Sequence, residues 1–375
     1  MKRLIQLLAI VSVVGVMALL SGCEKENLGG KGAFKEVIFG AKAHSSADTR
    51  TQYMDYDGTA AYQNIRWLAS DKIRIYSPDA ARRVAAEAGE ESDENPYYYW
   101  ADYQVVPTSD PTKGTLTNLS NDIPSVSDGG NGLVWLSETA TFYGVYPIPS
   151  GKNGTGSSVA DGKFDFHIPN SQSFSVKGDM SYAFMTAKTS SVKEGESVTL
   201  NFFPDFTAFE ISLKCGESES EVKLKSFEIG TTARTTANGH TGNLAGSYTV
   251  DLSGAKSYTL PDDASSYGKT ITVNMSSSPK TIPSGDADPL VFTVFAVPDN
   301  LSNLYIKFTT TTDGSERTWR LALNKNDSPI TFGACKKHRI YGLQLPTEEW
   351  KITYAEAGMV VEEWTIGNDQ TFVVE

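Results

Sequence analysis

Apolar and polar residues alternate with a period of two along most of the chain after residue 34. The alternation is clearest at residues 37–41, 73–75, 164–168, 209–215 and 304–308, where an apolar side chain takes every second position. Because successive side chains of a strand point to opposite faces, this pattern predicts strands with one packed and one solvated face, as in antiparallel sheets.

Turn dipeptides separate these runs. Asp313-Gly314 lies between the alternating segments 304–308 and 319–323 and predicts a hairpin. Only residues 79–91 favour helix, and because Gly89 limits that stretch we expect a loop insertion there. The sequence therefore predicts an all-β fold with two β-sandwich domains in series, residues 34–196 and 197–375, with the boundary in the polar stretch 190–196.

The first 23 residues have the order of a lipoprotein signal. Lys2 and Arg3 precede an apolar run over residues 4–20, which ends in Leu20-Ser21-Gly22-Cys23. Small residues before a cysteine at this point predict a signal peptide over residues 1–22, with Cys23 as the lipidated residue that anchors the chain in a membrane. The alternative is an uncleaved anchor helix, although the run is slightly shorter than the ~18 residues of a spanning segment. Residues 23–33 contain three glycines and predict a flexible tether.

Charge and cysteine content limit the partners. The net charge is −12 at pH 7, and no basic cluster offsets it, so we expect no nucleic acid as a partner. Besides Cys23 the chain has Cys215 and Cys335, which an oxidising compartment could pair in a disulfide. Two separate buried thiols are the open alternative, because pairing requires Cα atoms within about 7 Å.

No catalytic constellation stands out, and we expect neither an enzyme nor a cofactor or metal site. The sequence has no nucleophile elbow and no phosphate-binding glycine loop. Residues 55–58 resemble part of a calcium loop but lack its distal glutamate, which favours a turn. The pairs Glu348-Glu349 and Glu362-Glu363 would point to opposite faces of a strand and cannot converge on one sugar. The four histidines show no metal-ligand spacing: His44, His167, His240 and His338.

Two further features suggest binding or assembly. Tyr97, Tyr98, Tyr99 and Trp100 form an aromatic cluster in a stretch predicted as a polar loop, where they could contact a host glycan or protein ligand; the alternative is that they pack on the sheet beneath. Near the C-terminus the run 348–352 returns as 362–366, each time as Glu-Glu-Trp-x-Ile, which predicts two strands with the same face pattern.

A series of short motifs follows in order along the chain. They are Thr49-Arg50-Thr51, the run Trp67 to Tyr76, Ile168-Pro169 with Gln172, Asp179 to Ala183, and Val198 to Phe202 followed by Phe206 to Leu213. In this order the motifs resemble the fimbrillin family of Bacteroidetes lipoproteins, which are pilus subunits. Pro204 departs from the family, which often has His at this position, and implies a bulge or an edge position.

The resemblance implies a location and an assembly mechanism. It implies two transthyretin-like sandwiches, export to the outer membrane, and a place in a cell-surface fimbrium that supports adhesion. It further implies that an arginine-directed protease cuts at Arg50-Thr51, which removes the strand 37–43 with the lipid, and that a C-terminal strand from Lys351 onward fills the resulting groove of another pilus subunit. The alternative function is a surface glycan-binding lipoprotein outside any pilus, with the cluster 97–100 as its platform.

Overall fold

The computed structural model describes residues 37–43, 52–53, 65–83, 97–109, 113–119, 132–148, 162–216, 221–232, 243–260, 268–325, 328–345, 358–363 and 370–372. All of them belong to the larger of two units into which the chain divides, residues 36–375. The predicted signal peptide, Cys23, the tether, and the pair Arg50 and Thr51 lie outside the described residues.

The predicted all-β class is confirmed for the described part of the chain. The one helical element described there is a short 3-10 turn, η2 (Met180–Tyr182), whose N-terminus is capped by the side chain of Asp179. Within these residues no helix has both the length and the apolar character needed to cross a membrane.

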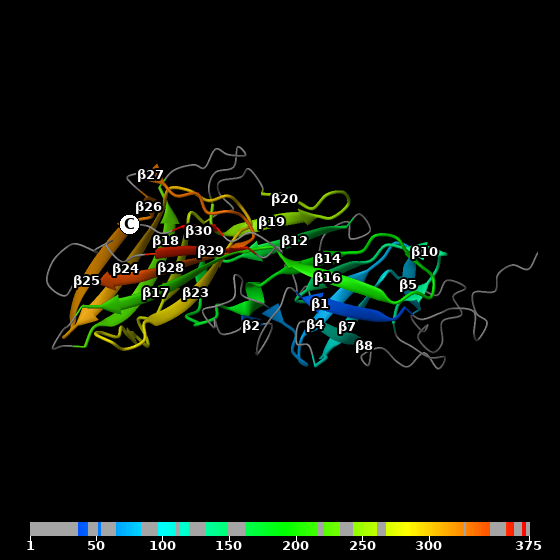
Figure 1. The fold of residues 1–375 in the computed structure, drawn as a ribbon, viewed down its shortest axis with the longest axis horizontal. Coiled ribbons are helices and arrows are strands. Elements are labelled where there is room, and N and C mark those ends of the chain that lie inside the picture. Colours follow the sequence, from blue (N-terminus) through cyan, green and yellow to red (C-terminus); the bar gives the residue numbers. More distant parts are fainter. Residues whose placement is uncertain are drawn as a thin grey trace, which may run out of the picture. The chain divides into compact units, whose positions relative to one another are not determined.

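Seven strands form a sheet that closes on itself. Backbone hydrogen bonds continue from strand to strand around the whole ring. These strands therefore form one closed sheet, whereas a sandwich has two separate sheets. Figure 1 shows β1 (blue) beside β16 (green), although more than 150 residues separate them in the sequence. In order around the ring the strands are β1 (Phe39–Ala43), β16 (Val198–Pro204), β14 (Met185–Lys188), β11 (Tyr143–Tyr146), β4 (Lys72–Tyr76), β7 (Trp100–Pro107) and β8 (Lys113–Asn118).

Three larger sheets come mainly from the second half of the chain. The first contains β12 (Lys163–Ile168), β19 (Gly246–Asp251) and β20 (Ser257–Thr259). The second contains β13 (Ser171–Gln172), β21 (Thr270–Asn274), β18 (Lys223–Thr231), β24 (Leu304–Thr312) and β25 (Ser315–Ala322), with β22 (Lys280–Thr281) also on β18. The third contains β23 (Leu290–Ala296), β17 (Thr207–Cys215), β28 (Lys336–Leu345), β29 (Gly358–Glu363) and β30 (Gln370–Phe372).

Short strand pairs complete the description. They are β10 (Thr139–Ala140) with β15 (Val192–Lys193), β2 (Gln52–Tyr53) with β3 (Ile65–Arg66), β26 (Asn324–Lys325) with β27 (Ser328–Pro329), and the group β6 (Tyr97–Tyr98), β5 (Ala80–Arg83) and β9 (Val134–Trp135). The strand β5 corrects the loop expected over residues 79–91. Pairing of Ala80 with Trp135 overrides the local helix preference, and the described part of that stretch is extended.

Apolar side chains of the alternating runs form the core. The inward positions of 37–41, 73–75, 164–168, 209–215 and 304–308 are all buried, as the period predicted. The second and third sheets pack through their aromatic residues, since the rings of Phe227 in β18 and Phe292 in β23 lie 4.9 Å apart in a T-shaped contact. Tyr76, at the end of β4, is also buried, and its ring packs against Phe164 of β12.

Several strands pair with partners on the other side of the domain boundary predicted at residues 196/197. β16 follows that boundary but belongs to the closed sheet, whereas β12 and β13 precede it and pair with β19 and β21. The division into two domains at this point stays a prediction. Pro204 is the last residue of β16, beyond the register with β1, which ends at Phe202, so its missing N–H interrupts no bond to β1.

Candidate functional site

The candidate site is the place that β1 takes in the closed sheet. β1 pairs in parallel with β16, from Phe39 opposite Val198 to Ala43 opposite Phe202. Its other edge pairs antiparallel with β8, where Ala41 lies opposite Gly114. One short strand near the start of the chain therefore supplies both ladders that close the ring. Without it, β16 and β8 would each present an unpaired edge.

The inward side chains of β1 and the residue two before it fill the interior of the ring. Val37, Phe39 and Ala41 are buried, whereas Ile38 on the other face is 69% exposed. The ring of Phe39 makes edge contacts with Tyr103 and Phe142, each at 5.1 Å between centroids. Burying a Val or Phe side chain contributes about 1.5–3 kcal/mol each, so removal of this strand would cost several kcal/mol.

Two local features fit this strand to its neighbours. Leu133 binds the backbone just before β1: its carbonyl accepts a hydrogen bond from Val37 N at 2.9 Å. The N–H of Leu133 donates to the hydroxyl of Tyr103 at 2.9 Å. Gly114, opposite Ala41, has no room for a side chain, since a Cβ there would lie 2.5 Å from Val105 Cγ1. The sequence reading missed Gly114, although an isolated glycine in a strand pattern indicates a close approach of backbone.

The last two strands of the chain, β29 and β30, lie at one edge of the third sheet, next to β28. β29 pairs antiparallel with β28, from Lys336 opposite Glu363 to Tyr341 opposite Gly358, and β30 pairs with β29. Glu362 and Glu363 are successive residues of this strand. Part of the predicted donor segment thus pairs within its own chain. Trp350 and Trp364 lie outside the described residues.

The aromatic cluster 97–100 lies on strands rather than in a loop. Tyr98 pairs with Arg82 through β6, and Trp100 opens β7, which corrects the predicted polar loop because distant strands provide partners. Tyr99 is 51% exposed. Trp100 is half-buried, and its ring carries the guanidinium of Arg74 at 3.9 Å. Arg74 therefore covers one face of the Trp100 ring. Of the two side chains of the cluster that the structure describes, Tyr99 and Trp100, Tyr99 is the exposed one.

Cys215 and Cys335 are free thiols and are not a disulfide. Cys215 Sγ donates to the carbonyl of Ile282 at 3.3 Å, whereas Cys335 N donates to the hydroxyl of Thr207 at 3.2 Å. Thr207 and Cys215 are the two ends of β17, about 25 Å apart at ~3.3 Å per residue. A bond needs Cα atoms within about 7 Å, so of the two alternatives left open by the sequence the structure has the separate thiols.

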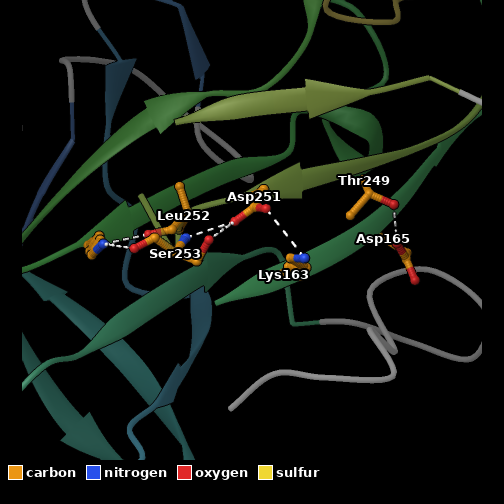
Figure 2. A network of polar contacts seen from close by, with 7 residues as sticks. Lys163, Asp165, Thr249, Asp251, Leu252 and Ser253 are labelled. Atoms are coloured by element: carbon orange, nitrogen blue, oxygen red, sulfur yellow. Dashed lines mark hydrogen bonds and ion pairs between the residues drawn. The ribbon is translucent and has the colours of Figure 1, made fainter. Parts of the chain in front are cut away.

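A polar network joins the closed sheet to the β19–β20 turn, and Figure 2 shows its part around Asp251, Ser253 and Lys163. Lys188, at the end of β14, donates to the carbonyls of Leu252 at 2.5 Å and Ser253 at 2.9 Å. Asp251 accepts from the Ser253 amide and hydroxyl at 2.8 and 2.6 Å, and these bonds lower the pKa of its carboxyl. The ion pair with Lys163 at 3.5 Å adds to this effect. The network holds β14 in place beside β16, the parallel partner of β1.

Metal chemistry has no support in the described residues. No group of three or more His, Cys, Asp or Glu side chains there is arranged to hold a metal ion. His338 is buried between Phe209 and Phe332, and His167 contacts Ser247, so these two histidines lie apart, in β28 and β12.

Solved structures similar to this chain include cell-adhesion and fimbrial proteins. A structure from Bacteroides ovatus, described as a cell adhesion protein, matches with a TM-score of 0.50 and 12% identity over 90% of this chain and 100% of that one. A fimbrial assembly protein from Parabacteroides distasonis matches with a TM-score of 0.39 and 10% identity over 90% and 98% of the two chains. The tip fimbrial protein Mfa3 from Porphyromonas gingivalis matches with a TM-score of 0.38 and 10% identity over 88% and 100%. No protein-family model and no curated protein sequence matches.

Proposed function

We propose that this chain is a subunit of a cell-surface pilus that assembles by strand exchange after proteolysis and supports adhesion. The observation that carries the proposal is the place of β1, which joins β16 to β8 and closes the sheet. β1 also lies between the lipidation site predicted at Cys23 and the cleavage site predicted at Arg50-Thr51. One cut would release the lipid and the closing strand together.

The physical argument follows from what the cut leaves behind. Two strand edges and the apolar sites of Val37, Phe39 and Ala41 would be open to water. An added strand with alternating apolar residues restores both ladders through its backbone, and its side chains set the register. We assign this role to the segment from Lys351 onward of another subunit, which carries Trp364, the counterpart of Trp350 in the internal repeat.

The proposal is tested with the purified full chain and an arginine-specific protease. The wild-type chain should yield a product that begins at Thr51 and then a ladder of oligomers. Arg50→Ala should remain a monomer that retains β1, whereas Thr51→Ser, which keeps the arginine, should be cut and should polymerise.

A second variant separates cutting from donation. A chain truncated after Pro346 should be cut at Arg50 but should not polymerise, because it has no donor segment. Polymerisation of the cleaved truncated chain would place the donor elsewhere. Normal polymerisation of Arg50→Ala would make Arg50 an ordinary loop residue. A chain that is cut and never forms oligomers supports the alternative of a glycan-binding surface lipoprotein, for which the exposed Tyr99 is the one observation in favour.

A further inference from the structure

A buried carboxyl group and a lysine meet between β16 and β17. Asp205 connects these strands, and its side chain is fully buried. Lys256, in the turn between β19 and β20, forms an ion pair with Asp205 Oδ1. The lysine side chain is 26% exposed, and its Nζ also lies 3.5 Å from the carbonyl of Phe203. The amine is thus held against one carboxyl oxygen.

The other contacts of Asp205 are arranged around that carboxyl group. Tyr258 Oη donates to Oδ1 at 3.0 Å and accepts from the thiol of Cys335 at 3.1 Å. Tyr248 Oη donates to the backbone carbonyl of Asp205 at 2.5 Å. Oδ2 is buried and has no hydrogen-bond partner. Burial raises the pKa of Asp205, although Lys256 and the neighbouring hydroxyls of Thr186 and Tyr258 oppose the shift.

The pair formed by Glu210 shows what an ordinary buried ion pair looks like in this protein. Glu210 Oε2 lies 2.6 Å from Lys337 Nζ, and Oε1 lies 3.0 Å from Arg339 Nε. Each oxygen of that carboxylate therefore faces a cation of its own. Asp205 has one cation, on Oδ1, and burial raises the pKa of its carboxyl, which favours the neutral acid. A neutral acid beside an amine is the combination from which an amide can form.

We propose that Lys256 and Asp205 join in an intramolecular isopeptide bond. A proton passes from the Lys256 ammonium to Oδ1, the oxygen that it contacts. The free amine then attacks Cγ, and the electron pair of the carbonyl moves to Oδ2. Oδ1 leaves as water with a second proton from Nζ, and the hydroxyl of Tyr258, which donates to Oδ1, assists its departure. One C–N bond forms, one C–O bond breaks and one water is released, with no oxidant or reductant.

The bond would connect two separate parts of the fold. It links the end of β16, which pairs with β1, to the β19–β20 turn that Lys188 contacts. A pulling force on the closed sheet would then act on a covalent bond in addition to the hydrogen bonds of Lys188. The inference stands apart from the proposed function, because it concerns no cleavage and no second subunit.

Tryptic peptides of the full chain recovered from cells provide the test. Trypsin should fail to cut after Lys256 and should yield residues 194–214 joined to residues 235–269, lighter by one water than the two peptides together. Lys256→Arg retains the positive charge and should abolish the linked species. Tyr258→Phe should slow its appearance after synthesis. The contact between Glu210 and Lys337 serves as an internal control, because no species should join residues 194–214 to the peptide that carries Lys337.

Recovery of residues 235–256 as a free peptide at full yield would overturn the proposal, and this result needs no variant. Loss of water confined to the Asp205 peptide, without a link to Lys256, would overturn it as well. Persistence of the linked species in Lys256→Arg would assign the bond to another residue and equally refute it.

Discussion

At the scale of single residues, Gln172 replaces a missing strand partner. Its side-chain amide donates to the carbonyl of Phe295 at 2.7 Å and accepts from the N–H of Phe295 at 3.0 Å, as a neighbouring strand would. A second bond reaches the carbonyl of Pro169 at 3.3 Å. β13 pairs with β21 in the second sheet, and this side chain joins it to β23 in the third. The resemblance named Gln172, but only the fold gives it a role.

Substitution of Gln172 by Leu should destabilise the protein by about 2–4 kcal/mol, because the N–H and C=O of Phe295 would be buried without partners. Urea unfolding measures this as a lower midpoint with an unchanged slope. Gln104→Leu is the control: its side-chain bond to the Ala69 carbonyl is exposed, so the loss should stay below about 1 kcal/mol. Equal losses in the two variants would contradict the role assigned to Gln172.

His338 makes the stability depend on pH. Burial lowers the pKa of His338 from 6.5 to about 4 in the folded chain. Between these values the unfolded state binds a proton that the folded state does not, so stability falls as the pH drops from about 6.5 to about 4. The effect is at most about 3 kcal/mol and is complete below the folded pKa. Urea unfolding over this range, compared with His338→Phe, isolates it. The stability difference between wild type and variant should shrink as the pH falls; a constant difference would exclude His338.

At the scale of elements, the local sequence predicts where the chain turns better than it predicts which strands pair. The hairpin of β24 and β25 is confirmed, with Asp313 at φ 49° and Gly314 at φ 80° between the paired residues Thr312 and Ser315. Both turn residues are in the left-handed region, as a type I′ turn requires, and a dipeptide can encode this. The strands at 80–83 and 97–98 were not predicted, because their extended form depends on partners far away in the chain.

Gly314→Ala should cost about 1–2 kcal/mol through backbone strain alone. A Cβ at this position would meet no atom within 4 Å, so the expected loss has no steric part. Gly254→Ala is the matched control, because its Cβ also meets nothing and its φ lies outside the left-handed region. Chemical denaturation of both variants checks the difference. A Gly314→Ala protein as stable as the control would mean that the turn changes type without cost.

At the scale of the whole molecule, the closed sheet and the strands of the second half are interleaved. β12 and β13 leave the first half of the chain to pair with β19 and β21, and β16 returns to the ring beside β1. Lys188 adds a contact between β14 and the β19–β20 turn. Loss of β1 would therefore open one ring while the strands around it keep their own partners. This is the condition for exchange of one strand without global unfolding.

The lipid on Cys23 is predicted to anchor the whole molecule in the membrane. Cys23→Ser should leave the chain without a lipid and uncleaved by the lipoprotein signal peptidase, because the sulfur that carries the lipid is absent. The protein should then be lost from the membrane fraction or remain as a precursor, which fractionation and intact mass would show. Cys215→Ser, a change at a buried thiol, should retain the lipid. Normal processing and membrane retention of Cys23→Ser would refute the assignment.

Alternation and turn chemistry are local, so the sequence by itself determined the all-β class, the buried face of β1 and the β24–β25 hairpin. Within one strand or turn, neighbouring residues alone set the backbone conformation and the side-chain faces. The sequence did not determine that β1 lies between β16 and β8, that the two thiols are at opposite ends of β17, or that Lys256 meets Asp205. Each of these depends on which distant strand edges pair, and backbone hydrogen bonds are the same for every pair of strands. Only the packing of the complete set of side chains selects among those pairings.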